Sequence, residues 1–425
     1  MNTTVEKIEN ERLGSCYYKV KHSSGLTMLL APMEGFTTSY AMFGTAYGSV
    51  DTFIKTDEKG EFKKLPEGIA LYLEHKLFES EECSAFDRYA KTGANANAFT
   101  SFDRTSYLFT CSQNFKESLE ILLDFVTHPY FTAETVAKEQ GIIGQEIRMY
   151  DDSPDWRVLF NLLGAIYHKN PVKIDIAGTK ESIAQITADL LYDCYNTFYN
   201  LHNMVLAVAG NFEIDDVLKV ADSVLKPAEP FFLERGDCGE PEEVVTNFVE
   251  QHLPVSVPMF TVGFKGKTGT EAENYKGSVL DEIFLEALFD DYTDLYRGLY
   301  DEGAINATFG SEVFCGRDYI TLLVSGESRE PEKVYEKVKA GFAEALEHGI
   351  PEDVFECAQK SVYGRYLRAT ERVEGVTTTL FNGYFPGVDM YEMIEAAATA
   401  TPETVLERIR NTYCAENSAL SVIRP

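Results

Sequence analysis

The order of strand-like and helix-like segments occurs twice along this chain of 425 residues, and this repetition limits the possible folds. In the first half, β-prone runs at 26–32 and 40–48 come before a helical pattern at 66–79. In the second half, a strand at 259–264 comes before a long apolar helix at 276–290. We therefore expect a duplicated α+β domain, with mostly antiparallel sheets flanked by helices.

The segments that follow support the duplication. In the first half they are strands at 97–101, 105–110 and 204–210 and helices at 115–127, 133–150 and 183–199; in the second half they are strands at 307–312 and 320–325. The two halves end alike, because residues 186–208 are echoed by residues 400–423. Proline, glycine and acidic residues gather at 226–243, as linkers often have them. We therefore expect domains at 1–235 and 236–425.

Charge and hydropathy exclude several classes of protein. The formal net charge is −30, from 68 acidic and 38 basic residues, and this repels nucleic acid and anionic membranes. It serves solubility or an acidic surface that attracts basic peptides, and the sequence leaves both open.

No basic segment followed by an apolar stretch opens the chain, and no apolar run approaches the ~18 residues of a membrane helix. Eight scattered cysteines without a Cys-x-x-Cys pair suggest reduced thiols. We expect a cytoplasmic protein that binds neither nucleic acid nor membrane.

One helix face carries candidate chemistry. Positions i, i+3 and i+4 of a helix share a face, so Leu71, Glu74 and His75 project together. A metal ligand at 75 would then lie beside a base at 74. The pair alone is weak support, because Leu346-Glu347-His348 repeats it without any accompanying motif.

The surrounding residues strengthen the case. The stretch Gly68-Ile-Ala-Leu71-Tyr-Leu-Glu74-His75-Lys-Leu-Phe78 resembles the Gly-x-Ala-His-x-x-Glu-His-x-x-Phe pattern of the pitrilysin/insulinase family of zinc peptidases. Residues 93–101 are similar to the family's strand that pairs with substrate backbone. The resemblance implies that this strand binds peptide through four residues: Asn97, Ala98, Phe99 and Thr100.

A third match concerns two glutamates on one helix. Glu139 and Glu146 lie seven residues apart and therefore on one face. The resemblance implies zinc ligands at position 71, His75 and Glu146, with Glu74 as the base and Glu139 supporting the metal site. Leucine has no lone pair, and even the loss of groups behind metal ligands costs about 10- to 100-fold. We therefore expect zinc to bind weakly or not at all.

The second half departs from the family pattern as well. The family has an arginine and a tyrosine there, which hold substrate and stabilise the developing oxyanion. Tyr300 and Asn306 stand at those places, with a one-residue gap in the comparison. Two parts of the catalytic apparatus are thus altered.

These observations lead to one expected function and two alternatives. We expect a catalytically impaired or inactive member of the family that keeps a peptide-binding chamber and acts as a partner subunit. The alternatives are an active zinc metalloendopeptidase that hydrolyses peptides in the cytoplasm, and a structural subunit that binds no peptide. Its partners would be peptides or small unfolded polypeptides. Because family members of this length resemble half of a clamshell, a homodimer or a heterodimer with a homologous chain is expected.

Overall fold

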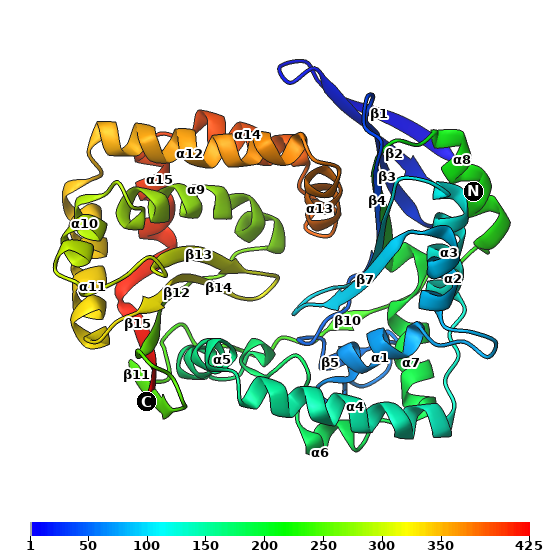
Figure 1. Cartoon of the computed structure of the whole chain (residues 1–425), viewed down its shortest axis with the longest axis horizontal. Coiled ribbons are helices and arrows are strands. Elements are labelled where there is room, and N and C mark those ends of the chain that lie inside the picture. The colour runs from blue at the N-terminus through cyan, green and yellow to red at the C-terminus, as the bar shows by residue number, and fades with distance from the viewer. Residues whose placement is uncertain (1) are drawn as a thin grey trace. The chain divides into compact units, whose positions relative to one another are not determined.

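The structure is a computed structural model that describes residues 2–425 and divides into two compact units (Figure 1). Neither unit is a continuous stretch of chain. The first unit contains residues up to Ile147, Asp175–Gly236 and Arg368–Phe385, and the second contains Arg148–Ile174, Asp237–Leu367 and Pro386–Pro425. Each unit is built around one large sheet.

The first unit holds a seven-stranded sheet in the order β1-β2-β3-β9-β4-β8-β7. Its strands are β1 Thr4–Asn10, β2 Ser15–Lys21, β3 Thr27–Pro32, β4 Ser39–Thr45, β7 Asn95–Thr100, β8 Thr105–Cys111 and β9 Met204–Gly210. All neighbours are antiparallel except β3 and β9. Every residue of β9 is buried, as expected for an apolar strand covered on both faces. A smaller sheet joins β5 Phe53–Lys55, β6 Lys63–Lys64 and β10 Glu234–Arg235.

Helices of the first unit come from both halves of the chain. They are α1 Ile69–Leu77, α2 Ala85–Thr92, α3 Phe115–Thr127, α6 Lys180–Ile183, α7 Ala188–Phe198, α8 Ile214–Val224, the 3₁₀ turn Leu201–Asn203 and α13 Val373–Tyr384. The long helix α4, Ala133–Asp151, begins in the first unit and ends in the second.

The second unit repeats this arrangement around a five-stranded sheet in the order β11-β15-β12-β14-β13. Its strands are β11 Phe248–His252, β12 Met259–Gly266, β13 Gly310–Cys315, β14 Ile320–Glu327 and β15 Tyr413–Arg424. Its helices are α5 Pro154–Ile166, the 3₁₀ turn Pro171–Lys173, α9 Glu271–Phe289, α10 Asp294–Asp301, α11 Pro331–His348, α14 Met390–Thr399 and α15 Pro402–Thr412, together with most of α12 Glu352–Thr370.

Five strands of the two sheets correspond one to one. The order β3-β9-β4-β8-β7 matches β11-β15-β12-β14-β13, and the single parallel pair, β3 with β9 or β11 with β15, lies at the same place in both. The prediction of an α+β fold with two sheet-and-helix domains is confirmed. The limits 1–235 and 236–425 stay proposed limits of the repeated sequence.

Each half of the chain gives one helix to the other half's sheet. Helix α5 packs on β15, β12 and β11 of the second unit, whereas α13 packs on β9, β4 and β3 of the first. These strands correspond in the two sheets, so the exchange is reciprocal. Each sheet therefore covers apolar residues with a helix encoded in the other half.

Several predicted elements begin or end elsewhere; the helix expected at 276–290, for example, starts at Glu271 and ends at Phe289. The helix expected at 66–79 starts at Ile69, because Gly68 takes a left-handed conformation, with φ of 85°. The helix expected at 183–199 is broken, since the side chain of Thr187 accepts the Leu190 N–H and starts α7 there. Asn306 folds into a turn with Thr308, so β13 starts at Gly310 instead of 307.

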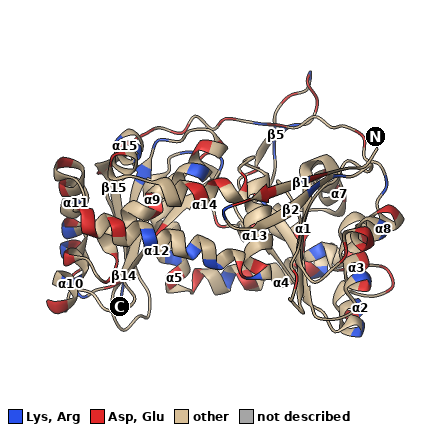
Figure 2. Cartoon of the chain, turned by 90° about the horizontal axis from the view of Figure 1, so that it is seen from above, with Lys and Arg blue, Asp and Glu red and all other residues tan. Residues whose placement is uncertain are grey.

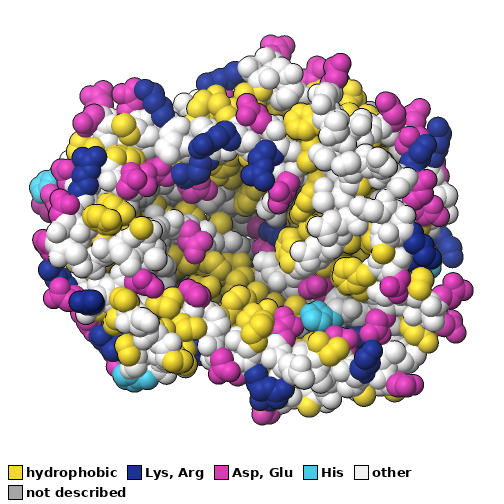
Figure 3. All heavy atoms as spheres, in the orientation of Figure 1, with side chains coloured by type: hydrophobic (Ala, Val, Ile, Leu, Met, Phe, Trp, Pro, Cys, Tyr) yellow, Lys and Arg dark blue, Asp and Glu magenta, His cyan; other side chains and the backbone are white. Residues whose placement is uncertain are grey.

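Charged residues of both signs cover the exposed surfaces. Figure 2 shows acidic and basic residues on the outer helices of each unit, such as α8 and α11. The face in Figure 3 likewise carries Asp and Glu interspersed with Lys and Arg. Among residues 2–425, no helix is both long and apolar enough to cross a membrane.

Candidate functional site

Helix α1 carries three of the predicted site residues and lies beside α4. The backbone at Gly68 approaches Ala177 so closely that a Cβ there would clash with the Ala177 carbonyl oxygen. Ser182 also donates its hydroxyl to the Glu67 carbonyl oxygen at 2.8 Å. These contacts fix the start of α1, and its next two turns carry Leu71, Glu74 and His75.

The imidazole of His75 lies between two carboxylates of α4. Its Nδ1 is 3.1 Å from Glu139 Oε1, and its Nε2 is 3.5 Å from Glu146 Oε2. The side chains of His75 and Glu146 are 25% and 21% exposed, so solvent reaches this cluster. The structure therefore brings together three residues that the sequence placed on two separate helices.

The surrounding carboxylates favour the protonated form of the His75 ring. Burial opposes charge on His75, but the hydrogen bond with Glu139 and the charges of Glu74, Glu146 and Glu139 outweigh it and raise its pKa above the usual value. Burial raises the pKa of Glu139, yet the hydrogen bond and charge of His75 lower it overall. The arrangement suits an imidazolium that donates from both ring nitrogens.

Glu74, on the same helix, is less exposed to solvent than His75. It is buried, and its Oε2 accepts the hydroxyl of Thr100 at 2.8 Å. Burial raises the pKa of Glu74, against the charge of His75 and the Thr100 hydrogen bond, which lower it. A carboxylate with a raised pKa, held by one hydroxyl, is chemically suited to accept a proton. The Thr100 hydroxyl thus holds this carboxylate in place.

Leu71 lies one helical turn before His75 and is buried. A catalytic zinc normally takes three protein ligands and a water molecule. Here His75 Nε2 and the Glu146 carboxylate supply two donors, and leucine supplies none. Among residues 2–425, no group of three or more His, Cys, Asp and Glu side chains is placed to hold a metal ion. The residues present do not fit a three-ligand zinc site.

Strand β7 forms the edge of the first sheet. It pairs with β8, where Ala98 lies opposite Tyr107, and it is the last strand in the sheet order. The Asn97 side chain is turned back on the chain, because its Oδ1 accepts the Ala98 N–H at 2.9 Å. Phe99 is 39% exposed. An edge with small or exposed side chains leaves room for an added extended strand.

Tyr300 and Asn306 lie in the second unit, where they have local partners. Tyr300 is 50% exposed and stacks on Tyr296, with ring centroids 5.8 Å apart. Asn306 donates its amide to Glu327 Oε2 at 2.8 Å. Asn306 therefore stabilises the turn before β13, whereas the Tyr300 ring faces solvent.

Two residues of α1 that sequence reasoning passed over fasten it to α4. Lys76 is fully buried; its ammonium group pairs with Glu79 and donates to the Thr135 carbonyl oxygen at 3.3 Å. Tyr72 donates its hydroxyl to the Val136 carbonyl oxygen. The signal for Lys76 was a lysine within a mostly apolar helix, where a buried charge requires a partner.

Comparisons with known proteins agree over the whole chain. Residues 60–180 match the family described as Insulinase (Peptidase family M16), and residues 185–362 match the Peptidase M16 inactive domain. The uncharacterized zinc protease YmfH of Bacillus subtilis (strain 168) is 36% identical over 428 residues, covering 99% of each chain. The crystal structure of an M16-like peptidase from Alicyclobacillus acidocaldarius superposes with a TM-score of 0.90 at 33% identity, covering 100% of this chain and 99% of that one. A protease structure from Helicobacter pylori has the same fold, with a TM-score of 0.82 at 16% identity and full coverage of both chains.

Proposed function

This chain belongs to the M16 (pitrilysin/insulinase) family of peptidases, and from that membership we propose that it binds extended peptides but hydrolyses them slowly or not at all. In this proposal it is a zinc-protease homologue with a degenerate metal site, acting as a partner subunit. Its peptides would be unfolded segments of polypeptide.

Leu71 is the observation that carries the proposal. It stands where the family motif has its first metal-binding histidine, and no other donor replaces it among the described residues. The remaining pair, His75 and Glu146, would hold zinc at two points instead of three. Weak zinc retention follows from the missing third ligand.

Peptide binding rests on the edge strand. Residues Asn97, Ala98, Phe99 and Thr100 lie on β7, the last strand of its sheet. Main-chain hydrogen bonds at a free edge give affinity for any extended segment, with little dependence on sequence. The Thr100 hydroxyl donates a hydrogen bond to the Glu74 carboxylate, so a peptide added to β7 would run near this carboxylate. Loss of zinc leaves this mode of binding intact.

The decisive experiment restores the missing ligand. Leu71→His should bind one zinc ion per chain and gain peptide hydrolysis, while the natural chain and Leu71→Ala should do neither. The double variant L71H/E74Q should hold zinc without hydrolysis, because Glu74 is the proposed base. Metal content by plasma emission and cleavage of fluorogenic peptides give the two readouts. Stoichiometric zinc and equal rates in the natural chain would overturn the proposal.

The first alternative is a working zinc metalloendopeptidase. It is favoured by the retained Glu74, His75 and Glu146 and by relatives whose names include zinc protease. A substrate group or a water molecule would then complete the metal site in place of Leu71. Chelator-sensitive hydrolysis by the natural chain, abolished in E74Q, would establish it.

The second alternative is a structural subunit without peptide binding. One relative, 27% identical over 46% of this chain, is the beta subunit of a mitochondrial-processing peptidase from Caenorhabditis elegans. We propose a homodimer or heterodimer with a homologous chain, in the cytoplasm; light scattering of the purified chain gives the stoichiometry.

Proline introduced into β7 at Ala98 should weaken peptide binding by removing one N–H. Absence of peptide binding in the natural chain would favour the structural role, whereas unchanged binding in the proline variant would place the peptide away from β7.

A further inference from the structure

The turn between β7 and β8 is joined to the end of α13 through one arginine. Arg104 donates from Nη1 to the Asn382 carbonyl oxygen and to Asn382 Oδ1, each at 3.1 Å. Its Nε and Nη2 bind the Asp103 carboxylate at 2.8 and 3.0 Å. The guanidinium group also lies over the ring of Phe385, 5.7 Å from its centroid. All four residues belong to the first unit, although two of them come from the second half of the chain.

The chemistry of this junction requires arginine. The last carbonyl groups of a helix have no partner within the helix, and the negative end of the helix dipole favours a cation there. Arg104 satisfies one such carbonyl of α13 while its planar fork binds Asp103 at two points. Lysine carries the charge but not the fork. Both Arg104 and Asp103 are largely buried, so the contact is shielded from solvent.

The same turn leads directly into the candidate peptide-binding strand. Ser101 donates its N–H to the Arg104 carbonyl oxygen at 2.8 Å, which closes the turn next to Thr100. Val50 donates to the Phe102 carbonyl oxygen at 2.8 Å from the other side. Arg104 therefore helps to set where Thr100, and hence the end of β7, lies against Glu74.

Helix α13 is a firm point of attachment. Its Phe381 ring lies so close to β4 that a Cβ on Gly44 would be 2.7 Å from it. Thr377 donates its hydroxyl to the Val373 carbonyl oxygen of its own helix at 2.8 Å and contacts the Tyr40 carbonyl oxygen of β4 at 3.3 Å. Because α13 is packed closely on β4, it is a fixed support for the turn that Arg104 joins to its end.

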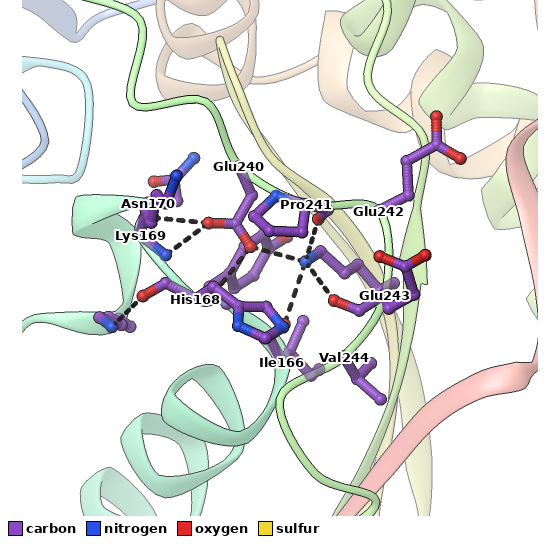
Figure 4. Close-up of polar contacts among 12 residues, drawn as sticks. Ile166, His168, Lys169, Asn170, Glu240, Pro241, Glu242, Glu243 and Val244 are labelled. Atoms are coloured by element: carbon purple, nitrogen blue, oxygen red, sulfur yellow. Dashed lines mark hydrogen bonds and ion pairs between the residues drawn. The ribbon is translucent and has the colours of Figure 1, made fainter.

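The second unit fastens its exchanged helix at the corresponding place. Beyond α5, Asn170 donates its amide to the Asp318 carbonyl oxygen in the β13–β14 turn at 2.8 Å. Glu240 accepts the N–H groups of residues 168 to 170, and the buried Lys265 ammonium joins Glu240 to the Ile166 carbonyl oxygen (Figure 4). Tying the exchanged helix to the edge hairpin is thus common to both units, with different residues in each.

We propose that Arg104 is a positioning residue for peptide binding, which uses α13 to hold the β7 edge in register with Glu74. This inference rests on the proposed peptide-binding function. It assigns a role in the peptide site to the segment 373–385, which lies outside every motif of that site. Arg104 itself need not touch the peptide.

Arg104→Met, Arg104→Lys and Asn382→Ala test the proposal in the full chain. Arg372→Met is the matched control, because Arg372 precedes the opposite end of α13 and, among residues 2–425, its exposed side chain pairs with the exposed Glu374. Hydrogen–deuterium exchange of residues 95–105 and anisotropy with fluorescein-labelled casein peptides are measured together with thermal stability. In R104M we expect exchange of this segment to be about tenfold faster and peptide affinity to be about tenfold weaker. R104K should lie between R104M and the natural chain.

Each outcome decides the proposal. Faster exchange confined to 95–105 together with weaker peptide binding, with R372M unchanged, supports it; peptide affinity unaltered in both R104M and R104K overturns it. Should R104M fail to fold, R104K and N382A carry the same comparison. If the natural chain binds no casein peptide, the proposed function fails, while the exchange measurement still decides whether Arg104 holds β7.

Discussion

Corresponding helices of the two units each carry a charged cluster, but one cluster is buried and closed and the other is open to solvent. In the second unit, Asp281 of α9 is fully buried, and Arg408 binds both of its oxygens at 3.1 Å while Tyr413 donates to one at 2.9 Å. In the first unit, His75 of α1 contacts Glu139 and Glu146 with about a quarter of its side chain exposed. A closed cluster only stabilises, whereas an open one leaves donors for a ligand.

The lengths of the two helices accompany this difference. Helix α9 has 19 residues and begins with a capping box in which Thr270 and Glu273 satisfy one another's N–H groups. Helix α1 has nine residues, and no side chain caps its first turn. The shorter helix depends on Gly68, Tyr72 and Lys76 for its place. The duplicated scaffold is therefore regular where it stabilises and irregular where the candidate chemistry lies.

The largest effect should come from breaking the closed cluster. Arg408→Met leaves the Asp281 carboxyl buried without its cation, and we expect the free energy of unfolding to fall by about 3–5 kcal/mol in urea titrations. Arg410→Met on the same helix is the control; its exposed side chain contacts the Leu346 carbonyl oxygen, and its loss should cost less than about 1 kcal/mol. Equal losses in the two variants would contradict the assignment.

A second, smaller effect should appear at Glu240 and should depend on pH. Burial raises the pKa of this carboxyl, but the Lys265 ammonium and the N–H groups of residues 168 to 170 lower it overall. Replacing Glu240 by Gln should cost about 2 kcal/mol at neutral pH, because charge-assisted hydrogen bonds are lost.

The sign of the pH dependence follows from the lowered pKa. Since the folded carboxyl binds its proton less readily than the unfolded one, its stabilisation is complete above the unfolded pKa. It is lost as the pH falls through the folded pKa. Urea midpoints of the natural chain should therefore converge on those of E240Q in acid. Glu242→Gln, in the same loop but exposed, should leave the natural pH profile unchanged.

The smallest effect on stability is expected in the open cluster. Glu146→Gln should change the free energy of unfolding by less than about 1 kcal/mol, because partly exposed ion pairs contribute little. In the L71H background the same change should nevertheless remove zinc binding, since it takes away one of three ligands. A large loss of stability in E146Q would show that the first cluster is structural like the second.

The pattern of neighbouring residues was sufficient to predict several helix faces and strands of this protein. Helical spacing placed Glu74 and His75 on one face of α1, and Glu139 and Glu146 on one face of α4, and the structure brings the two faces into contact. The strands predicted at 97–101 and 105–110 also lie close to the observed β7 and β8. These predictions held because each depends on residues close in sequence or on a recognised motif.

Contacts between distant segments could not be predicted. Nothing in the periodicity of α13 shows that its Asn382 meets Arg104, 278 positions away. Nor does the apolar pattern of α5 reveal which sheet it covers, because an apolar face fits either of two similar sheets. Glu240 lies in a stretch read as a linker, although its carboxylate binds three successive N–H groups. In each case the contact depends on a partner that is distant in the sequence and comes close only in the folded chain.

The exchange of α5 and α13 has a consequence for synthesis on the ribosome. All seven strands of the first sheet have been made once residue 210 has left the tunnel, but α13 ends only at Tyr384. At about 5–20 residues per second, the sheet face that α13 covers remains uncovered for roughly 9 to 35 s before its helix has been made. During that interval Gly44 and its neighbours on β4 and β9 are open to other apolar chains. We expect the nascent first half to be a chaperone client and a truncated product to aggregate.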